Sequence, residues 1–555
     1  MDYADQAIPV YTNLTDVFGG IGASLQSIER WNGLAQEFEK KFGRKPSYIA
    51  RAPGRVNLIG EHIDYALFGV LPAAVEPDIL IACGPTSTST SGSGSVVAEN
   101  LHGKYSRQEF SPIVRGRSVD DTTHVEEWHL DINTKELRWE SYVKAGYYGV
   151  LQHYFPSSKG TVEKGPVPVD LLVTGSVPAG SGLSSSAAMV VASTLAFLAV
   201  NDKLGHGPER PSTLTKGQLV KMAMENEKTS CMDQAASVMS DPASALYISF
   251  YPALKASPAS LPPGVVFVIA NSLVISDKAV TAKTNYNLRV VETLVAARVL
   301  ARTFGVEVGQ ERITLREVVG KYSGETPGNW LSVEKLATAL EDVLEKLDVL
   351  KAREGSRSGV TMEEMVEMSG LAPDAFHRIY LSWIDVKATH FELYKRAKHV
   401  FSEALRVLQF RQVCLESQDS TEGDVAGYRR KLGDLMNESQ ESCAELFNCS
   451  CPEIDQLTKL ARSAGAIGSP FLGAGWGGCT VSMVAEHQVK GFISKIRDEY
   501  PPYQSLDEAA LGEAIFATKP GRGACGESPR RLAYKKRSDY QPVFSTEGLN
   551  MWFCP

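Results

Sequence analysis

The sequence predicts a mixed protein of helices and strands that folds as two or three domains. Its 555 residues exceed one typical domain of roughly 100–200 residues and allow substantial apolar cores. Strand-like apolar runs occur at residues 71–83, 168–177 and 265–272, whereas apolar stripes with helical spacing dominate the region from there to about residue 460. The Pro-rich stretch at 257–264 is the candidate domain boundary.

The composition argues against several classes of protein. Hydrophobic content of 43%, charged content of 22% and a net charge of −8 lack the basic excess of a dedicated nucleic-acid binder. The N-terminus carries acids where a signal peptide would be basic, and no uninterrupted apolar run reaches the ~18–20 residues that span a bilayer. We expect neither nucleic acid nor membrane as a partner.

The nine cysteines are scattered over the chain. The closest pair, Cys449 and Cys451, lacks the ligand spacing of a zinc site. We therefore expect reduced thiols and a cytoplasmic protein.

The N-terminal elements follow from local patterns. A helix is predicted over residues 27–43, because apolar residues recur at three- and four-residue spacings before a stop glycine: Trp31, Leu34, Phe38, Phe42 and Gly43. Residues 71–83 predict strands, and the Gly/Ser-rich residues 84–95 predict an exposed hairpin loop.

The later elements follow in the same way. The strand at 168–177 ends at Pro178, and a helix begins near Ser184. Two helical stripes predict core faces: Leu336, Leu340, Val343, Leu347 and Leu350, and Tyr394, Ala397, Phe401, Ala404 and Leu408. The glycine loop at 473–478 precedes a strand at 480–484, and the basic residues after Gly526 predict a solvated tail.

The stretch VPAGSGLSSSAAMVVAS at 177–193 suits phosphate binding. The start of a helix offers unpaired N–H groups and a positive dipole end, and Gly180 and Gly182 let an anion approach the backbone. The serines at 184–186 add donors, and one of them can give an oxygen to a phosphate-bound Mg²⁺. A solvent-exposed helix cap made of small residues is the alternative.

Two familiar nucleotide motifs do not explain this chain. GxxxxGK[ST] is absent, and GAGWGG at 473–478 precedes a predicted strand, whereas a Rossmann fingerprint requires a helix there. The motifs of a protein kinase are absent as well.

The segment GRVNLIGEHIDY concentrates polar groups of both charge signs around an apolar strand. Arg55, Glu61, His62 and Asp64 suit a neutral, hydroxyl-rich ligand, because carboxylates accept from hydroxyls and Arg steadies developing negative charge. A surface ion-pair cluster is the alternative. In SCMDQAAS, Asp233 stands among apolar and small residues, where it suits proton transfer or a helix cap.

Together these segments resemble the signatures of the galactokinases, a family within the GHMP kinase superfamily. GRVNLIGEHIDY, GLSSSAA and GAGWGGCTVSMV match the family's three motifs in order, and the similarity runs from about Ile8 to Gly526. The resemblance implies an α+β fold with an N-terminal domain like the second domain of ribosomal protein S5, over 1–264. A ferredoxin-like GHMP kinase domain would occupy 265–526, with the active site between the two and an unstructured basic tail at 527–555.

The resemblance also implies a catalytic pair and a sugar site. Asp233 would accept or orient the proton of the sugar's C1 hydroxyl, and Arg55 would keep Asp233 ionised and stabilise the moving phosphoryl group. The residues that would read the sugar are Glu61, His62, Asp64 and Tyr286.

The remaining implied roles concern the cofactors ATP and Mg²⁺. By the same resemblance, Gly180, Gly182, Ser184 and Ser185 would cradle the ATP phosphates, and Trp139 and Tyr142 would lie beside adenine. Ser186 and Glu227 would bind Mg²⁺.

One departure from the family pattern lies just before Asp233. Relatives place a glycine-containing run there, whereas this chain has NEKTSCMDQ, a shortened loop without glycine, in which Cys231 adopts positive φ less freely than Gly. Three explanations stay open: the loop takes another path, sugar binding is impaired, or a few codons are missing from the sequence.

The predicted activity is ATP-dependent phosphorylation of galactose to galactose 1-phosphate. The resemblance leaves two alternatives open. One is an N-acetylgalactosamine kinase, and the other is a non-catalytic galactose and ATP sensor that binds a transcriptional repressor.

Overall fold

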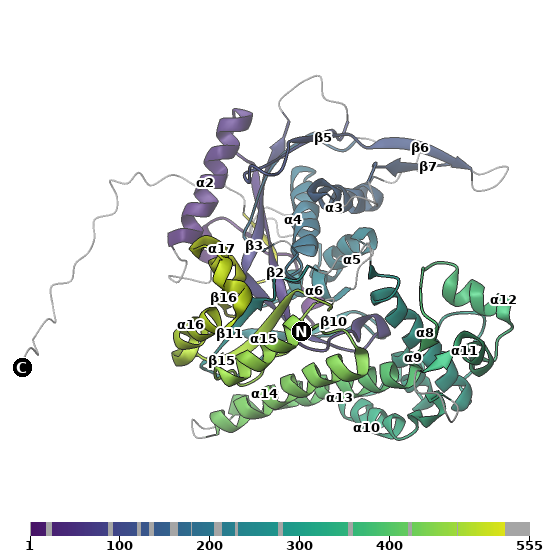
Figure 1. The fold of residues 1–555 in the computed structure, drawn as a ribbon. Coiled ribbons are helices and arrows are strands. Elements are labelled where there is room, and N and C mark those ends of the chain that lie inside the picture. Colours follow the sequence, from purple (N-terminus) through teal and green to yellow (C-terminus); the bar gives the residue numbers. More distant parts are fainter. Residues whose placement is uncertain are drawn as a thin grey trace, which may run out of the picture.

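The structure, a computed structural model, places two sheets and a helical array around one extended core (Figure 1). It describes residues 2–17, 25–86, 93–118, 124–132, 138–155, 165–178, 180–204, 214–227, 231–275, 281–352, 359–419, 424–473 and 475–527. Half of the predicted hairpin loop at 84–95 and all but Glu527 of the predicted tail at 527–555 lie outside the described residues. None of the helices in these ranges is long and apolar enough to cross a membrane.

The larger sheet has seven strands in the described part of the chain, in the order β1-β17-β2-β3-β8-β4-β5. Its strands are β1 (Val10–Tyr11), β2 (Tyr48–Ile59), β3 (Leu71–Pro85), β4 (Val96–Asn100), β5 (Gln108–Phe110), β8 (Val169–Gly175) and β17 (Cys525–Glu527). β2 is buried over its whole length, which explains why its sequence shows no alternation of apolar and polar residues. The pairing of β2 with β3 shifts register between Pro53 and Arg55 and again between Asn57 and Ile59. These irregularities flank the catalytic candidate Arg55.

Helices cover both faces of this sheet. α2 (Leu25–Phe42) packs Trp31, Leu34 and Phe38 on one face, as its stripe predicts. On the other face lie α3 (Trp139–Tyr154), α4 (Ser185–Val200), α5 (Lys216–Glu227) and α6 (Cys231–Met239). α4 is buried from Ala187 to Ala199, so it is the central helix of this layer and its sequence is apolar on all sides.

The smaller sheet is antiparallel, in the order β14-β15-β11-β16. It consists of β11 (Val265–Asn271), β14 (Phe471–Leu472), β15 (Cys479–Ala485) and β16 (Ile515–Thr518), and it packs on α15 (Pro452–Ser463), α16 (Val489–Glu499) and α17 (Glu508–Ala514). The expected division at residue 264 falls between β10 and β11. The chain then returns to the first sheet, where β17 pairs with β1 and β2.

A helical array joins the two sheets, and its long helices run along the lower edge in Figure 1. Its central member is α13 (Leu393–Glu416), which packs on α8 (Tyr286–Thr303), α10 (Val333–Leu344) and α14 (Val425–Ser442). The other described helices are α1 (Leu14–Val17), α9 (Leu315–Tyr322), α11 (Met362–Ser369) and α12 (Pro373–Phe376). Four of the remaining strands form the hairpins β6 (Ile113–Ser118) with β7 (His124–His129) and β9 (Ser244–Ser249) with β10 (Lys255–Ser260). β12 (Val360–Thr361) and β13 (His390–Phe391) pair across the segment that contains α11 and α12.

The helix and strand predictions are largely confirmed. Residues 71–83 lie in one continuous strand, and the glycine loop leads into β15, as expected of a chain without a Rossmann fingerprint. The stripe that begins at Leu336 is not one helix, because α10 ends at Leu344 and Leu347–Leu350 form a separate 3₁₀ turn. The stripe is buried on both sides of this break, because Leu347 and Leu350 also lie in the core.

Candidate active site

The catalytic candidates meet where β2, the start of α4 and the start of α6 converge. Arg55 on β2 is buried, and Asp233 lies in the first turn of α6. The guanidinium donates from Nε at 2.9 Å and from Nη2 at 2.8 Å, both to Oδ1 of Asp233. In the described part of the chain no hydrogen bond reaches Oδ2 of Asp233, so this oxygen is available to a substrate hydroxyl.

The glycine-serine loop closes around the same arginine. Arg55 donates through Nη1 to the carbonyl of Gly182, and its backbone N–H donates to the carbonyl of Leu183 at 3.1 Å. Gly182 has φ of +81°, and a Cβ there would lie 3.0 Å from the carbonyl oxygen of Leu472. Only glycine suits both the left-handed backbone and this close approach. The phosphate-loop candidate, β2 and the C-terminal glycine loop therefore share one junction.

Glu61 connects the sugar-site candidates to that junction. Its buried carboxylate accepts from the N–H of Gly473 at 3.4 Å. Burial raises the pKa of Glu61 well above its usual value, against the opposing charge of Arg55. A carboxyl group that holds its proton in this way can donate to an oxygen of a neutral ligand as well as accept.

His62 faces aromatic side chains from several segments. Its ring centroid lies 5.0 Å from Phe447, 5.8 Å from Trp476 and 6.0 Å from Tyr286. Its Nδ1 is 3.3 Å from the hydroxyl of Tyr65. Such a wall presents apolar ring faces and a few polar atoms, which is the usual composition of a small-molecule site.

Tyr286 begins α8 and lies close to two of the candidate carboxylates. Burial raises the pKa of its hydroxyl, and the negative charges of Asp64 and Asp233 raise it further. The hydroxyl therefore stays protonated at neutral pH and can donate a hydrogen bond. The structure thus places Tyr286 near Asp64 and Asp233, which come from two other stretches of the sequence.

Most of the nucleotide candidates line one cavity of about 400 Å³. Trp139 and Tyr142 from α3 form part of its wall, and Gly180, Ser185 and Ser186 stand at the start of α4. Nε1 of Trp139 is buried and has no hydrogen-bond partner in the described structure, as expected of a donor that awaits a ligand. The cavity therefore brings the predicted adenine residues together with Gly180 and Ser185, whereas Gly182 and Ser184 are not part of its wall.

Ser184 precedes α4 in the left-handed conformation, with φ of 57°. Its hydroxyl is buried and also lacks a partner within the described residues. Together with the free N–H groups of the first turn of α4, this orphaned hydroxyl suits a phosphate.

Only two residues, Ser186 and Glu227, are predicted to bind Mg²⁺. Ser186 lines the cavity, whereas Glu227 ends α5 and its side chain lies outside the description. The described residues contain no group of three or more His, Cys, Asp or Glu that could hold a metal. Mg²⁺ in kinases is held by one or two protein oxygens, substrate phosphates and water, so the Ser186 oxygen fits that ion without such a group.

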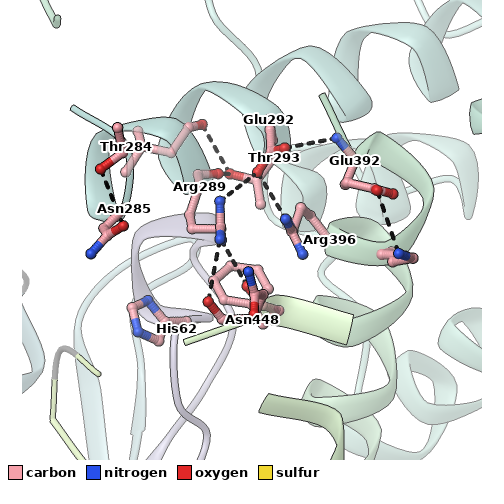
Figure 2. A network of polar contacts seen from close by, with 12 residues as sticks. His62, Thr284, Asn285, Arg289, Glu292, Thr293, Glu392, Arg396 and Asn448 are labelled. Atoms are coloured by element: carbon pink, nitrogen blue, oxygen red, sulfur yellow. Dashed lines mark hydrogen bonds and ion pairs between the residues drawn. The ribbon is translucent and has the colours of Figure 1, made fainter. Parts of the chain in front are cut away.

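A buried ion network supports the aromatic side chains that surround His62 (Figure 2). Arg289 on α8 donates to the carbonyl of Phe447 at 2.7 Å and to that of Asn448 at 3.3 Å. Glu292 accepts from Arg289 at 3.2 Å and from Arg396 on α13 at 2.9 Å. Arg289 also stacks on Trp476, with its guanidinium carbon 5.6 Å from the ring centroid.

A second network holds the turn that carries Glu61 and His62. Glu403 on α13 is fully buried and accepts from the N–H of Gly60 at 2.8 Å and from the hydroxyl of Ser439 at 2.7 Å. His399 contacts the carbonyl of Glu61 at 3.0 Å through Nε2, and burial lowers the pKa of His399 to about 4. Because a carbonyl only accepts, Nε2 carries the proton of this neutral ring.

Sequence reasoning missed these supporting residues. Arg289, His399 and Glu403 stand in helical patterns that predict only a packed array, and nothing in their spacing indicates contact with residues 60–62. The cavity wall also contains residues not predicted for it: Asn100, His102, Lys104 and Tyr105. The sequence offered one signal of the supporting residues, namely Trp476, an aromatic residue inside the glycine loop.

Comparison with known protein families agrees with this geometry. A model described as the galactokinase galactose-binding signature matches residues 36–85. Models of the GHMP kinase N-terminal and C-terminal domains match residues 142–241 and 426–502. Fold and site therefore define a GHMP kinase, and the predicted α+β architecture of that superfamily is confirmed.

Similar proteins with a named activity show which family of GHMP kinases the chain belongs to. The galactokinase of Dictyostelium discoideum is 34% identical over 546 residues, which cover 95% of this chain and 99% of the relative. The galactokinase of Saccharomyces cerevisiae is 35% identical over 530 residues, which cover 90% of this chain and 94% of the relative. The chain belongs to the galactokinase family of ATP-dependent sugar kinases.

Solved structures agree on the fold. The crystal structure of Lactococcus lactis galactokinase complexed with galactose superposes with a TM-score of 0.58 at 20% identity, and the match covers 89% of this chain and 99% of that one. At this identity the match concerns the fold alone.

Proposed function

We propose that this enzyme transfers the γ-phosphoryl group of ATP to the C1 hydroxyl of galactose, and that Arg55 and Asp233 carry the reaction. The observation that carries the proposal is the charged pair itself. It lies at the junction of the sugar-site candidates and the phosphate loop, with one oxygen of Asp233 held by Arg55 and the other available.

The two residues have separate roles. Asp233 orients the C1 hydroxyl and accepts its proton as the oxygen attacks phosphorus. Arg55 holds Asp233 in place through their ion pair and, being buried, stabilises negative charge that spreads over the moving phosphoryl group. Phosphoryl transfer depends mainly on positioning and charge stabilisation, both of which the Arg55–Asp233 pair can supply.

The sugar is recognised by groups that both donate and accept. Asp64 accepts from sugar hydroxyls, His62 presents its ring within the aromatic wall, and the protonated hydroxyl of Tyr286 donates. Glu61 does either, because burial favours its protonated form. A neutral, hydroxyl-rich substrate suits this set better than a charged one.

ATP occupies the cavity beside α3 and α4. Trp139 and Tyr142 flank the adenine, while Gly180, Gly182, Ser184 and Ser185 donate to the phosphates at the start of α4. Ser186 and Glu227 would hold Mg²⁺. When bound, that ion neutralises charge on the phosphates.

The test measures ADP release with Mg²⁺-ATP and galactose, N-acetylgalactosamine, glucose or no sugar. Asp233→Asn keeps the shape of the side chain and should lower kcat at least about a hundredfold, the usual contribution of a general base. Asp348→Asn, in an exposed ion pair with Lys351, is the matched control and should keep full activity. Equal turnover in the two variants would refute the catalytic role of Asp233.

The same assay separates the alternatives. Faster turnover with N-acetylgalactosamine than with galactose would make that sugar the substrate. Absence of turnover, with heat stabilisation by galactose in the presence of ATP, would favour a sensor that binds a transcriptional repressor. The complete run of serines at 184–186 supports catalysis. The free cysteines of the described residues support the cytoplasm as the location.

A further inference from the structure

A second cavity lies outside the catalytic junction, between the β9–β10 hairpin and helices α9, α10 and α13. Its volume is about 430 Å³, within the range of ~300–1,000 Å³ that is usual for small-molecule sites. Its apolar wall contains Leu67, Pro252, Leu331, Val333 and Leu336, and its aromatic wall contains Tyr247, Tyr251 and Trp330. None of these residues has a role in the proposed reaction.

Cations stand among the aromatic rings of this cavity. The guanidinium of Arg316 lies 4.7 Å from the ring centroid of Tyr251, and that of Arg411 lies 5.1 Å from the ring centroid of Tyr247. Lys255 adds a third positive group at the wall. Flat rings beside guanidinium groups favour a ligand that has an apolar ring and a negative charge.

The two arginines differ in how their charge is balanced. Arg316 forms a two-point ion pair with the buried carboxylate of Glu325, at 2.9 Å and 2.7 Å. Arg411 forms no ion pair with any described residue, and its Nε is buried without a hydrogen-bond partner. Glu334 is exposed on α10 and is attracted electrostatically by Arg411, but the two side chains form no ion pair. A buried donor without a partner is costly, which points to a partner from outside the chain.

The acidic residue at the wall, Asp2, does not neutralise Arg411. Asp2 accepts instead from the backbone N–H groups of Ala4 at 3.1 Å and of Ala256 at 2.9 Å. The cavity therefore keeps an excess of positive charge, contributed by Arg411 and Lys255.

We propose that this cavity is a second ligand site, which takes a small organic anion: a flat apolar ring that carries a phosphate or a carboxylate. The ring lies against Tyr247, Tyr251 and Trp330, and the anionic group pairs with Arg411. This chemistry differs from the neutral, hydroxyl-rich ligand of the sugar site.

The floor of the cavity is shared with the turn that follows the sugar-site candidates. Leu67 and Gly69 line the cavity, and Val70 pairs with Ile248 of β9 through two hydrogen bonds of 3.0 Å. A Cβ at Gly69 would lie 2.7 Å from the ring of Tyr247, so the turn and this ring are in tight contact. A ligand against Tyr247 thus rests on the segment that continues from Asp64.

The test uses anilinonaphthalene sulfonate, a flat aromatic anion that fluoresces in apolar surroundings. Arg411→Leu should weaken its saturable binding at least about tenfold, as expected for the loss of one charge-assisted contact. Trp330→Ala, at a 40% exposed position, is a milder second variant and should weaken binding about threefold or more through loss of ring contact. The matched control is Arg312→Leu, which removes a guanidinium stacked on Trp383 away from this cavity and should leave binding unchanged.

Competition identifies the anionic group and the need for the ring. Displacement of the probe by phenyl phosphate or by benzoate, but not by inorganic phosphate, supports the proposal and shows which group Arg411 prefers. Equal displacement by inorganic phosphate, no displacement by either ring compound, or identical titrations of Arg411→Leu and Arg312→Leu would each overturn it. An unchanged KM for ATP in Arg411→Leu shows that the lost signal did not come from the ATP cavity. The titrations and competitions are measured without turnover, so their outcome is independent of the proposed catalytic roles, and only the control on the KM for ATP requires an active enzyme.

Discussion

Glu403→Gln tests whether the helical array holds the sugar-site turn in place. Glu403 lies on α13 and binds the backbone N–H of Gly60 and the hydroxyl of Ser439 through Oε1, while Oε2 pairs with Arg406 at 2.9 Å. Glutamine keeps the shape and can keep the Oε1 contacts, so the variant removes mainly the charge that faces Arg406. The expected defect is therefore confined to one ion pair and the turn above it.

The magnitude follows from burial. Breaking a buried ion pair costs about 3–5 kcal/mol. We expect about 3 kcal/mol here, at the low end of that range, because the Arg406 side chain is 11% exposed and can gain some hydration while Glu403 is fully buried. The hydrogen bond that glutamine keeps to Gly60 is no longer charge-assisted, so it holds the turn that carries Glu61 and His62 less tightly. The KM for galactose should therefore rise while the KM for ATP stays unchanged.

The pH dependence has a definite sign. Burial alone would raise the pKa of Glu403, but the charge of Arg406 and the hydrogen bonds from Ser439 and Gly60 hold this pKa below its usual value of 4.5. The stabilisation is thus complete above pH 4.5 and is lost as the pH falls through the lower folded-state value. The gap between wild type and Glu403→Gln should be full at pH 7 and shrink in acid.

The assay combines chemical denaturation at several pH values with steady-state kinetics. Glu416→Gln, an exposed substitution near the end of the same helix, is the matched control and should change neither quantity. Equal stability of Glu403→Gln and wild type at pH 7, or a KM for galactose that does not rise, would refute the reasoning.

Three further substitutions test other parts of the structure. Trp139→Leu should raise the KM for ATP about threefold to tenfold without changing the KM for galactose, because it removes one aromatic wall of the nucleotide cavity. Gly182→Ala should lower kcat about tenfold to a hundredfold in the ADP-release assay, since the new Cβ meets Leu472 and displaces the phosphate loop. Glu527→Gln should stabilise the protein by about 3 kcal/mol at pH 8 and by little at pH 4, measured by denaturation. Burial raises the pKa of Glu527 from 4.5 to about 7, so the wild-type carboxylate destabilises the fold as the pH rises between these values, whereas glutamine does not titrate.

Local chemistry made part of the site predictable. Arg55, Gly182 and Asp233 each stand in a short motif whose residue types already suit phosphoryl transfer, and the structure brings Arg55 within hydrogen-bonding distance of both Gly182 and Asp233. The helix after Ser184 and the strand after residue 478 were predictable for the same reason, since both depend on neighbouring residues alone.

The supporting contacts were not predictable in this way. Glu403 reaches Gly60 across 343 positions of the chain, and Arg289 reaches Phe447 across 158. Within its own helix each looks like an ordinary polar residue, because the burial that makes it important comes from segments far away in the sequence. The second cavity is a stronger case, since Tyr247, Trp330 and Arg411 come from three different elements and share no motif.

The sequence by itself determined the family, the order of the main helices and strands, and the short motifs that carry the reaction, because each of these depends on residues close together in the chain. The tertiary structure alone decided which carboxylates keep their protons, that Arg411 has no ion pair among the described residues, and how the helical array holds the sugar-site turn. These properties depend on desolvation and on the distance between charges, and both quantities exist only once distant segments have packed together.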